Sequence, residues 1–290
     1  MPELPDIDVY VEALRERVHG ELLETVRVNT PFLVRSFDPA LSEADGRQVA
    51  DVRRLGKRIA IGLEPDYRLI VHLMVAGRLH WRDDRVALRG KQQLAAFDFN
   101  RGSLLLTEAG SKKRASLYVV KGDAALASHD PGGIEVLTCG ESAFKARLLA
   151  ENRTLKRALT NPRTFSGIGN AYSDEILHAA RLSPVRLTSR LTEEEQSRLY
   201  SATVETLTLW RDRLRREAGE AFPKKVTAFR DDMAVHGKFG KSCPACGTTV
   251  ARIRYKSNET NYCPGCQTGG KLLADRSLSR LLKDDWPDSV

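Results

Sequence analysis

The amino-acid sequence predicts an α+β protein of several domains, and three observations support this prediction. Residues 21–121 alternate between short apolar runs and turn residues, which is typical of β-strands. Residues 139–222 carry apolar side chains at helical spacing. Near the C-terminus, four cysteines form two C-x-x-C pairs. The chain of 290 residues is long enough for two or three domains.

The N-terminal part is expected to hold a helix followed by a β-rich region. Apolar residues at helical spacing predict an amphipathic helix over residues 6–18 that ends at Gly20. Farther along, the apolar run Tyr67–Met74 follows turn residues at 64–66, and the run Leu94–Phe99 precedes turn residues at 100–102. Strands at this spacing indicate a sandwich or a barrel. Residues 122–138 include Asp-Pro-Gly-Gly and predict a linker.

The middle of the chain is expected to be helical. Residues 141–150 and 153–160 predict short helices, and a capping box formed by Thr192 and Glu195 opens a long helix that reaches about Glu217. The residues expected on or near its buried face are Leu199, Val204, Leu207 and Leu214. Between these helices, a Gly-Ile-Gly turn exposes backbone amides that suit a phosphate, although a plain tight turn explains it equally well.

The cysteine spacing predicts a metal site. Sixteen residues separate the two pairs, a spacing typical of zinc ribbons, in which four thiolates surround one structural Zn²⁺. The predicted ligands are Cys243, Cys246, Cys263 and Cys266. Two disulfides or redox pairs are the alternative, which the lack of a secretion signal disfavours. Cys139 stands apart, as an incidental reduced cysteine of a cytoplasmic protein would.

Charge points to a polyanionic partner. The net charge is +8 and the isoelectric point about 9.3. Residues 224–271 hold nine basic residues against three acidic ones, so most of the excess lies in the cysteine-containing segment. This density favours binding to nucleic acid through phosphates, while a solvated basic face is the alternative. No apolar run is long enough for a transmembrane helix, so no membrane partner is expected.

The N-terminus offers a reactive amine. Removal of the initiator methionine would leave Pro2 with a secondary amine, whose pKa near 8 keeps a useful fraction unprotonated at neutral pH. Such an amine can form a Schiff base, and Glu3 stands beside it as a general acid. On these residues alone, a proline that starts a helix is the simpler interpretation.

Five short motifs occur in the order found in one family. They are Pro2-Glu-Leu-Pro5, Leu55-Gly-Lys-Arg58, Val71-His-Leu73, Gly167-Ile-Gly-Asn-Ala-Tyr172 and the ribbon ending Cys263-Pro-Gly-Cys-Gln267. Over residues 2–267 the chain resembles the bacterial formamidopyrimidine-DNA glycosylase and endonuclease VIII (Fpg/Nei) family. The resemblance implies an N-terminal β-sandwich with an N-terminal helix, a helix–two-turn–helix domain and a zinc finger. The expected bounds are 1–121, a linker at 122–138, 139–222 and 223–270, with a tail at 271–290.

The resemblance also implies residue roles. Pro2 would be the Schiff-base nucleophile, Glu3 would assist sugar-ring opening and proton transfer, and Lys57 would contact a phosphate and assist elimination, although a solvated strand-end lysine is its alternative. Lys156 and Asn170 would hold phosphates. The other positions expected to contact DNA are His72, Lys113, Arg114, Gly169, Lys238, Arg254 and Asn258.

The implied activity is that of a bifunctional DNA glycosylase and AP lyase of base-excision repair, which nicks abasic sites by β-elimination. Its expected partner is damaged double-stranded DNA, bound by a monomer that acts at the nucleoid in the bacterial cytoplasm. A catalytically weak protein that binds damaged or junction DNA on the same scaffold is the alternative.

Several positions depart from the family pattern. Asn258 replaces an arginine assigned to the second, δ-elimination step, and asparagine carries no charge. Val75 replaces the methionine that fills the void left by an extruded base. The loop of residues 110–115 lacks the family's aromatic residue and is purely cationic. The tail adds 24 residues after Cys266, whose leucines predict a further amphipathic helix. Lesion preference is therefore not transferred.

Overall fold

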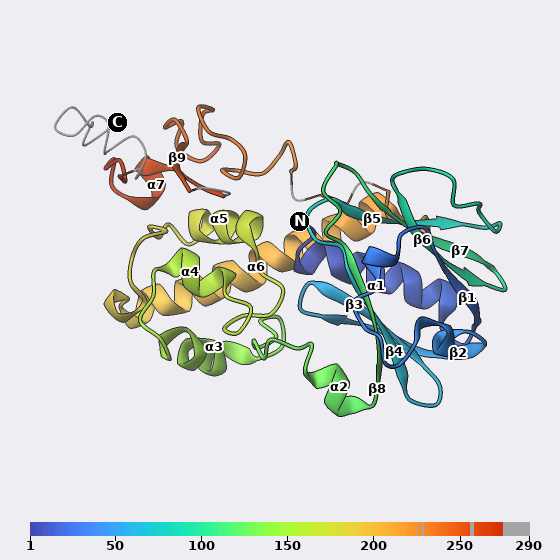
Figure 1. Ribbon diagram of the computed structural model, residues 1–290. Helices are drawn as coiled ribbons and strands as arrows, with labels where there is room; N and C mark the ends of the chain where they lie inside the picture. Colours follow the sequence, from blue (N-terminus) through green and yellow to red (C-terminus); the bar gives the residue numbers. More distant parts are fainter. Residues whose placement is uncertain (225, 228, 256–257, 275–290) are drawn as a thin grey trace. The chain divides into compact units, whose positions relative to one another are not determined.

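The computed structural model describes residues 1–274 except 225, 228, 256 and 257, and it confirms the predicted fold class (Figure 1). The chain forms two compact units. Unit 1 comprises Met1–Pro131 and Trp210–Thr227, and unit 2 comprises Gly132–Leu209 and Ala228–Val290. The predicted tail helix lies largely at 275–290, outside the described residues.

Unit 1 begins with the helix α1, Leu4–Val18. It starts two residues earlier than the apolar periodicity predicts, because Glu3 and Asp6 form a capping box and Pro5 lies in the first turn. The Glu3 N–H donates to Asp6 Oδ2 at 2.9 Å. The helix therefore fixes the chain up to its second and third residues.

Eight antiparallel strands follow. They are β1 (Leu22–Val28), β2 (Arg47–Leu55), β3 (Arg58–Leu63), β4 (Tyr67–His72), β5 (Gly77–Arg82), β6 (Gln93–Phe99), β7 (Gly102–Glu108) and β8 (Ser116–Lys121). Their order is β5-β7-β6-β1-β2-β3-β4-β8. Since β1 and β2 pair only at Leu22–Gln48 and Leu23–Arg47, the sheet divides there into the two halves of a sandwich (Figure 1). Two short 3₁₀ helices, η1 (Pro31–Leu33) and η2 (Leu41–Ala44), lie between β1 and β2.

The two halves and α1 share one apolar core. Alternate residues of β3 and β4, such as Ile59, Ile61 and Leu69, point into it beside Leu14 of α1. The opposite face of these strands is apolar as well and is covered by Leu126. That residue lies on α2 (Asp123–Ala127), a short helix inside the segment that the sequence predicts as a linker.

Unit 2 contains the predicted helices. They are α3 (Gly140–Leu149), α4 (Leu155–Thr160), α5 (Asn170–Ala179), the 3₁₀ turn η3 (Thr188–Arg190) and the first part of α6 (Glu193–Ala218), whose last part belongs to unit 1. The predicted capping box is confirmed, because the Glu195 N–H donates to Thr192 Oγ1 and the Thr192 N–H to Glu195 Oε2. Within residues 1–274, apart from the four gaps, no helix is both long and apolar enough to cross a membrane.

The cysteines lie on a small module of unit 2. A hairpin of β9 (Ala251–Arg254) and β10 (Glu259–Tyr262) leads into the short helix α7 (Pro264–Gln267). One C-x-x-C pair precedes the hairpin and the other follows it. We refer to residues 229–271 as the cysteine module.

The turn between β4 and β5 depends on glycine. The Gly77 N–H donates to the Leu73 carbonyl at 2.9 Å, and a Cβ atom at Gly77 would overlap that carbonyl group. We predict that Gly77→Ala lowers the free energy of unfolding of unit 1 by about 1–3 kcal/mol, measured by urea denaturation. Gly90→Ala is the control, because its Cβ would meet only Gln93 at 3.5 Å. Equal stability of the two variants would contradict the prediction.

Candidate active site and nucleic-acid interface

The N-terminus of unit 1 is surrounded by charged groups. Pro2 is buried and Glu3 is 2% exposed at the start of α1. The pKa of the Met1 amine is lowered, first by burial and then by the positive charges of Arg78 and Lys57, while the carboxylates of Glu3 and Asp6 raise it. An amine at this position is therefore unprotonated at a lower pH than an ordinary α-amino group.

Lys57 and His72 lie at one end of the half-sheet formed by β2, β3, β4 and β8. Gly56, with φ +62°, allows the tight turn that places Lys57 before β3. In the register, Arg58 faces His72, and His72 faces Ser116. The pKa of His72 is lowered to about 4 by burial and by the charges of Arg58 and Lys57. His72 is therefore neutral at pH 7 and can offer a phosphate a hydrogen bond but no positive charge.

Two loops border this end of unit 1. In the β4–β5 turn, Met74 has a left-handed backbone with φ 52° and Val75 is 53% exposed. In the β7–β8 loop, the buried Glu108 carboxylate accepts the N–H groups of Arg114 and Ala115 at 2.9–3.1 Å. The Lys113 ammonium donates to the Glu108 carbonyl, whereas the Arg114 side chain is exposed. Lys113 thus stabilises the loop that presents Arg114.

In unit 2, the Gly-Ile-Gly turn leads directly into α5. Gly167 has φ +79°, and Gly169 is the N-cap residue. Asn170 opens the helix, and its side-chain amide donates to the Glu259 carbonyl of β10 at 2.9 Å. The amides at this helix start form a site that favours an anion, while the Asn170 side chain links the turn to the cysteine module.

Lys156 on α4 is held by three acceptors. Its ammonium donates to the Asn170 carbonyl at 2.7 Å, to Ser173 Oγ at 2.8 Å and to Asp174 Oδ1 at 2.5 Å. The Asp174 side chain is fully buried, and its second oxygen lies 2.8 Å from His236 Nδ1. Since an ammonium has three N–H groups, Lys156 in this arrangement stabilises the first turn of α5. Phosphate binding by Lys156 stays a prediction.

The next residue of α5 holds the cysteine module. The Glu175 carboxylate accepts the backbone N–H groups of Ala234, Val235 and His236 at 2.8–2.9 Å. One turn later, His178 Nε2 lies 3.2 Å from Cys243 Sγ. The sequence analysis did not identify these residues as functional. One feature of the sequence could have identified them. Asp174 and Glu175 lie three and four residues after Ala171, so helical periodicity places both acidic residues on the same face as this apolar residue.

The four cysteine sulfurs converge on one point, and all lie within 4.8 Å of one another. The sulfur–sulfur distances include 3.3 Å for Cys246–Cys263 and 3.9 Å for Cys243–Cys266, too long for disulfide bonds and suited to a tetrahedral metal site. Burial raises the pKa of Cys263 to about 11, whereas hydrogen bonds with Thr248 lower the pKa of Cys246 to about 6, and like charges this close repel one another. Four neighbouring thiolates therefore require a positive charge, which a metal ion supplies. The four residues fit a metal ion.

The remaining predicted DNA contacts lie on the cysteine module. The Lys238 ammonium donates to the Asp231 carbonyl at 2.6 Å. Arg254 is exposed at the end of β9, and Asn258 is exposed just before β10. The Asn258 carbonyl accepts the Tyr255 N–H at 2.7 Å, which closes the hairpin. Of these two exposed residues of the hairpin, Arg254 carries a positive charge and Asn258 carries none.

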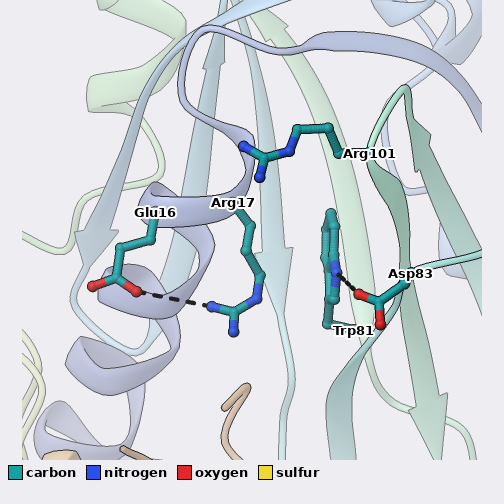
Figure 2. Close-up of a pocket in the computed structure, with 5 residues that line it drawn as sticks. All are labelled: Glu16, Arg17, Trp81, Asp83 and Arg101. Atoms are coloured by element: carbon teal, nitrogen blue, oxygen red, sulfur yellow. Dashed lines mark hydrogen bonds and ion pairs between the residues drawn. The ribbon is translucent and has the colours of Figure 1, made fainter. Parts of the chain in front are cut away.

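A pocket of about 310 Å³ lies in unit 1 at the C-terminal end of α1, away from the predicted site residues (Figure 2). It is lined by Glu16, Arg17, Trp81, Asp83 and Arg101. Arg17 donates to the carbonyls of Ala13 and Glu220, and the Trp81 indole donates to Asp83 at 3.1 Å. These polar groups are already engaged with one another or with the backbone.

Comparisons with known proteins agree with this architecture. Residues 1–112 match the formamidopyrimidine-DNA glycosylase N-terminal domain, and residues 135–210 match the H2TH domain of the same enzymes. The formamidopyrimidine-DNA glycosylase of Thermus thermophilus is 33% identical over 281 residues, covering 93% of this chain and all of the relative. An uncharacterized glycosylase-like protein of Mycobacterium tuberculosis is 42% identical over 139 residues, covering 48% of this chain and 86% of the relative.

A solved structure shares the fold. The Lactococcus lactis Fpg protein, in complex with DNA containing an oxidized pyrimidine, superimposes with a TM-score of 0.80 at 24% identity. The match covers 92% of this chain and all of that one. The N-terminal sandwich, the H2TH domain and the four-cysteine cluster define a DNA-repair glycosylase scaffold. The chain belongs to the formamidopyrimidine-DNA glycosylase (Fpg/Nei) family.

The contacts of Lys156 generate a prediction about stability. Lys156→Met would leave the buried Asp174 carboxylate without its ammonium partner, which typically costs on the order of 3–5 kcal/mol. We expect a lower unfolding temperature for unit 2, measured by differential scanning calorimetry. Lys145→Met is the control, because that lysine pairs with Glu141, whose side chain is 44% exposed and stays solvated without its partner. Weaker DNA binding by Lys156→Met at unchanged stability would instead indicate a direct phosphate contact.

Proposed function

We propose that the protein is a bifunctional DNA glycosylase and AP lyase. The observation that carries this proposal is the N-terminus: Pro2 is buried at the start of α1 beside Glu3, and the Met1 amine before it lies near the charge of Lys57. Family membership supports a glycosylase of base-excision repair. Damaged double-stranded DNA is the proposed substrate, in keeping with the DNA complexes of the structural neighbours.

In the proposed mechanism, the Pro2 nitrogen attacks the anomeric carbon of the damaged nucleotide. The base leaves with the electrons of the glycosidic bond and takes up a proton. Glu3 protonates the ring oxygen as the sugar opens, which yields the Schiff base. Loss of a proton from the adjacent carbon then expels the 3′ phosphate. We assign to Lys57 the stabilisation of negative charge on that phosphate.

DNA binding is proposed to use both units. In unit 1, His72 and Arg114 supply a neutral hydrogen-bond donor and an exposed cation, and Lys113 supports the loop of Arg114. In unit 2, the candidate contacts are the helix start at Gly169 and Asn170, which Lys156 supports, and the side chains of Lys238, Arg254 and Asn258. Their number implies a steep dependence of affinity on salt.

The first functional prediction concerns the amine. Sodium borohydride should trap a covalent protein–DNA adduct on abasic duplex DNA, and Pro2→Gly should trap more slowly while binding that DNA with similar affinity. Burial at this position lowers the pKa of the Met1 amine, and we expect the same direction for the Pro2 amine once Met1 is removed. The trapping rate should therefore rise with pH as the Pro2 amine loses its proton.

An N-terminally tagged form, in which the amine is blocked, is the control for this experiment. It should bind abasic DNA and give no adduct. Undiminished trapping by the tagged protein would contradict the assignment and implicate a lysine. If the untagged protein, with its initiator methionine removed, binds abasic DNA without being trapped, the second candidate function is favoured, that of a protein that binds damaged or junction DNA. The neutral Asn258 also favours this second function.

The second prediction concerns the metal, which we propose is one structural Zn²⁺ per chain. Elemental analysis should find one zinc per chain, and Cys263→Ser should reduce this content. Because metal binding supplies folding free energy, a strong chelator should unfold the cysteine module and weaken DNA binding together. Cys139→Ser is the control and should change neither. A zinc-free protein that binds DNA fully would refute the proposal.

The third prediction concerns the cleaved product. Asn258 lies exposed near the hairpin end and supplies no charge to the second elimination. Loss of a charged donor at a developing charge typically costs about 10²–10³ in rate. We therefore expect β-elimination products to accumulate on a sequencing gel, and Asn258→Arg to shift the product toward a one-nucleotide gap. Early dominance of the gapped product in the wild type would show that another cation, such as Arg254, acts instead.

A further inference from the structure

Phe32 is an exposed aromatic side chain on a well-anchored segment. It is 76% exposed, although the adjacent Leu33 is 2% exposed and belongs to the core of unit 1. The 3₁₀ helix η1 holds both residues, and backbone hydrogen bonds fix it on each side: Leu33 N–H to Thr30 and Val34 N–H to Pro31, each at 3.2 Å. Phe32 is therefore presented to solvent by an ordered turn.

The register places this turn at the end of the sheet that carries His72. Val34 forms a parallel bridge with Leu117 of β8, and the Arg35 N–H donates to the Leu117 carbonyl at 2.9 Å. Phe32 precedes the bridge, so it lies toward the start of β8. Ser116, the first residue of that strand, faces His72, and Arg114 lies just before it. The turn that carries the exposed Phe32 thus lies at the end of the sheet that also holds His72 and Arg114.

A phenylalanine on the same segment provides a contrast. Phe37 is 94% exposed, but it follows Ser36, whose Oγ accepts the Val119 N–H at 2.8 Å. Phe37 follows the Val34–Leu117 bridge, so it lies toward the end of β8. That end of β8 pairs with Tyr67 at the start of β4. At about 3.3 Å per strand residue, Phe37 lies roughly 10 Å or more from the His72 end.

The chemistry of this edge suits a nucleobase. Leaving a phenylalanine ring in water forgoes about 1.5–3 kcal/mol of burial free energy, so an ordered exposed ring is a surface that a partner can cover at little entropic cost. The nearby exposed cations Arg35 and Arg114 attract a phosphate backbone. Stacking of a base on an aromatic ring contributes about 1–3 kcal/mol, and the bases that border a gap in a duplex have exposed faces on which such a ring can stack.

We propose that Phe32 is a stacking residue, which inserts its ring into the base stack of duplex DNA beside an abasic or extruded nucleotide. This inference rests on the proposed function, because it requires that unit 1 binds damaged duplex DNA. The ring occupies space that the extruded base vacates and covers the exposed faces of the neighbouring bases. Single-stranded DNA offers no such gap, so the contribution of Phe32 is specific to the duplex.

The test compares Phe32→Ala, Phe32→Trp and the control Phe37→Ala by fluorescence anisotropy. The probes are an abasic duplex and the matching abasic single strand. Phe32→Ala should weaken duplex binding by about 10-fold, the size expected for loss of one stacked base, and leave single-strand binding unchanged within about 2-fold. Its salt dependence should equal that of the wild type, since no charge is removed. Phe32→Trp should retain duplex affinity, and Phe37→Ala should match the wild type.

Insertion is observed separately with 2-aminopurine placed opposite the abasic site. Binding of the wild type should change its fluorescence, and Phe32→Ala should abolish most of that change. Equal duplex affinity and equal 2-aminopurine signals for Phe32→Ala and the wild type would overturn the proposal while leaving borohydride trapping by the wild type intact. A wild-type protein that binds no abasic DNA would overturn the proposed function as well.

Discussion

Two adjacent buried carboxylates on α5 hold unit 2 together. Asp174 binds the Lys156 ammonium and faces His236, and Glu175 accepts three successive backbone N–H groups of the cysteine module. Buried carboxylates are tolerated only when their oxygens are fully hydrogen-bonded, as these contacts provide. The same helix begins at the proposed phosphate site and contacts a cysteine ligand through His178. A few turns of one helix therefore connect the proposed phosphate site with the four-cysteine cluster.

In unit 1 the corresponding constraint is the start of α1. The capping box orders the backbone at Glu3, so the proposed nucleophile, Pro2, is positioned by the start of a helix rather than by a loose terminus. Burial and nearby positive charges favour the neutral form of the Met1 amine that precedes it, whereas Glu3 and Asp6 act in the opposite sense. A nucleophile requires this balance, because a fully protonated amine cannot attack carbon.

Much of the fold could be predicted from local sequence signals. Helical periodicity located α1 and α6, turn residues delimited β4 and β6, and the cysteine spacing located the sulfur cluster. The α2 helix was missed because its five residues are too few for a periodic signal, and it is stabilised by packing on an apolar sheet face. Likewise, no local pattern shows that Lys156 meets Asp174 or that Phe32 lies beside the His72 end of the sheet. Such neighbours depend on strand register and helix packing.

The β7–β8 loop shows how a binding surface can change without a change of scaffold. Its shape is set by the Glu108 carboxylate, which binds backbone N–H groups of Arg114 and Ala115. Backbone groups are common to nearly all residues, so the side chains of Lys112 and Arg114 contribute little to the loop's conformation. Substitutions at these two positions can therefore change the charge and shape of the loop surface, and with them the proposed DNA contacts, at little cost in stability. Evolution or an engineer could exchange recognition there one residue at a time, provided that Glu108 is retained.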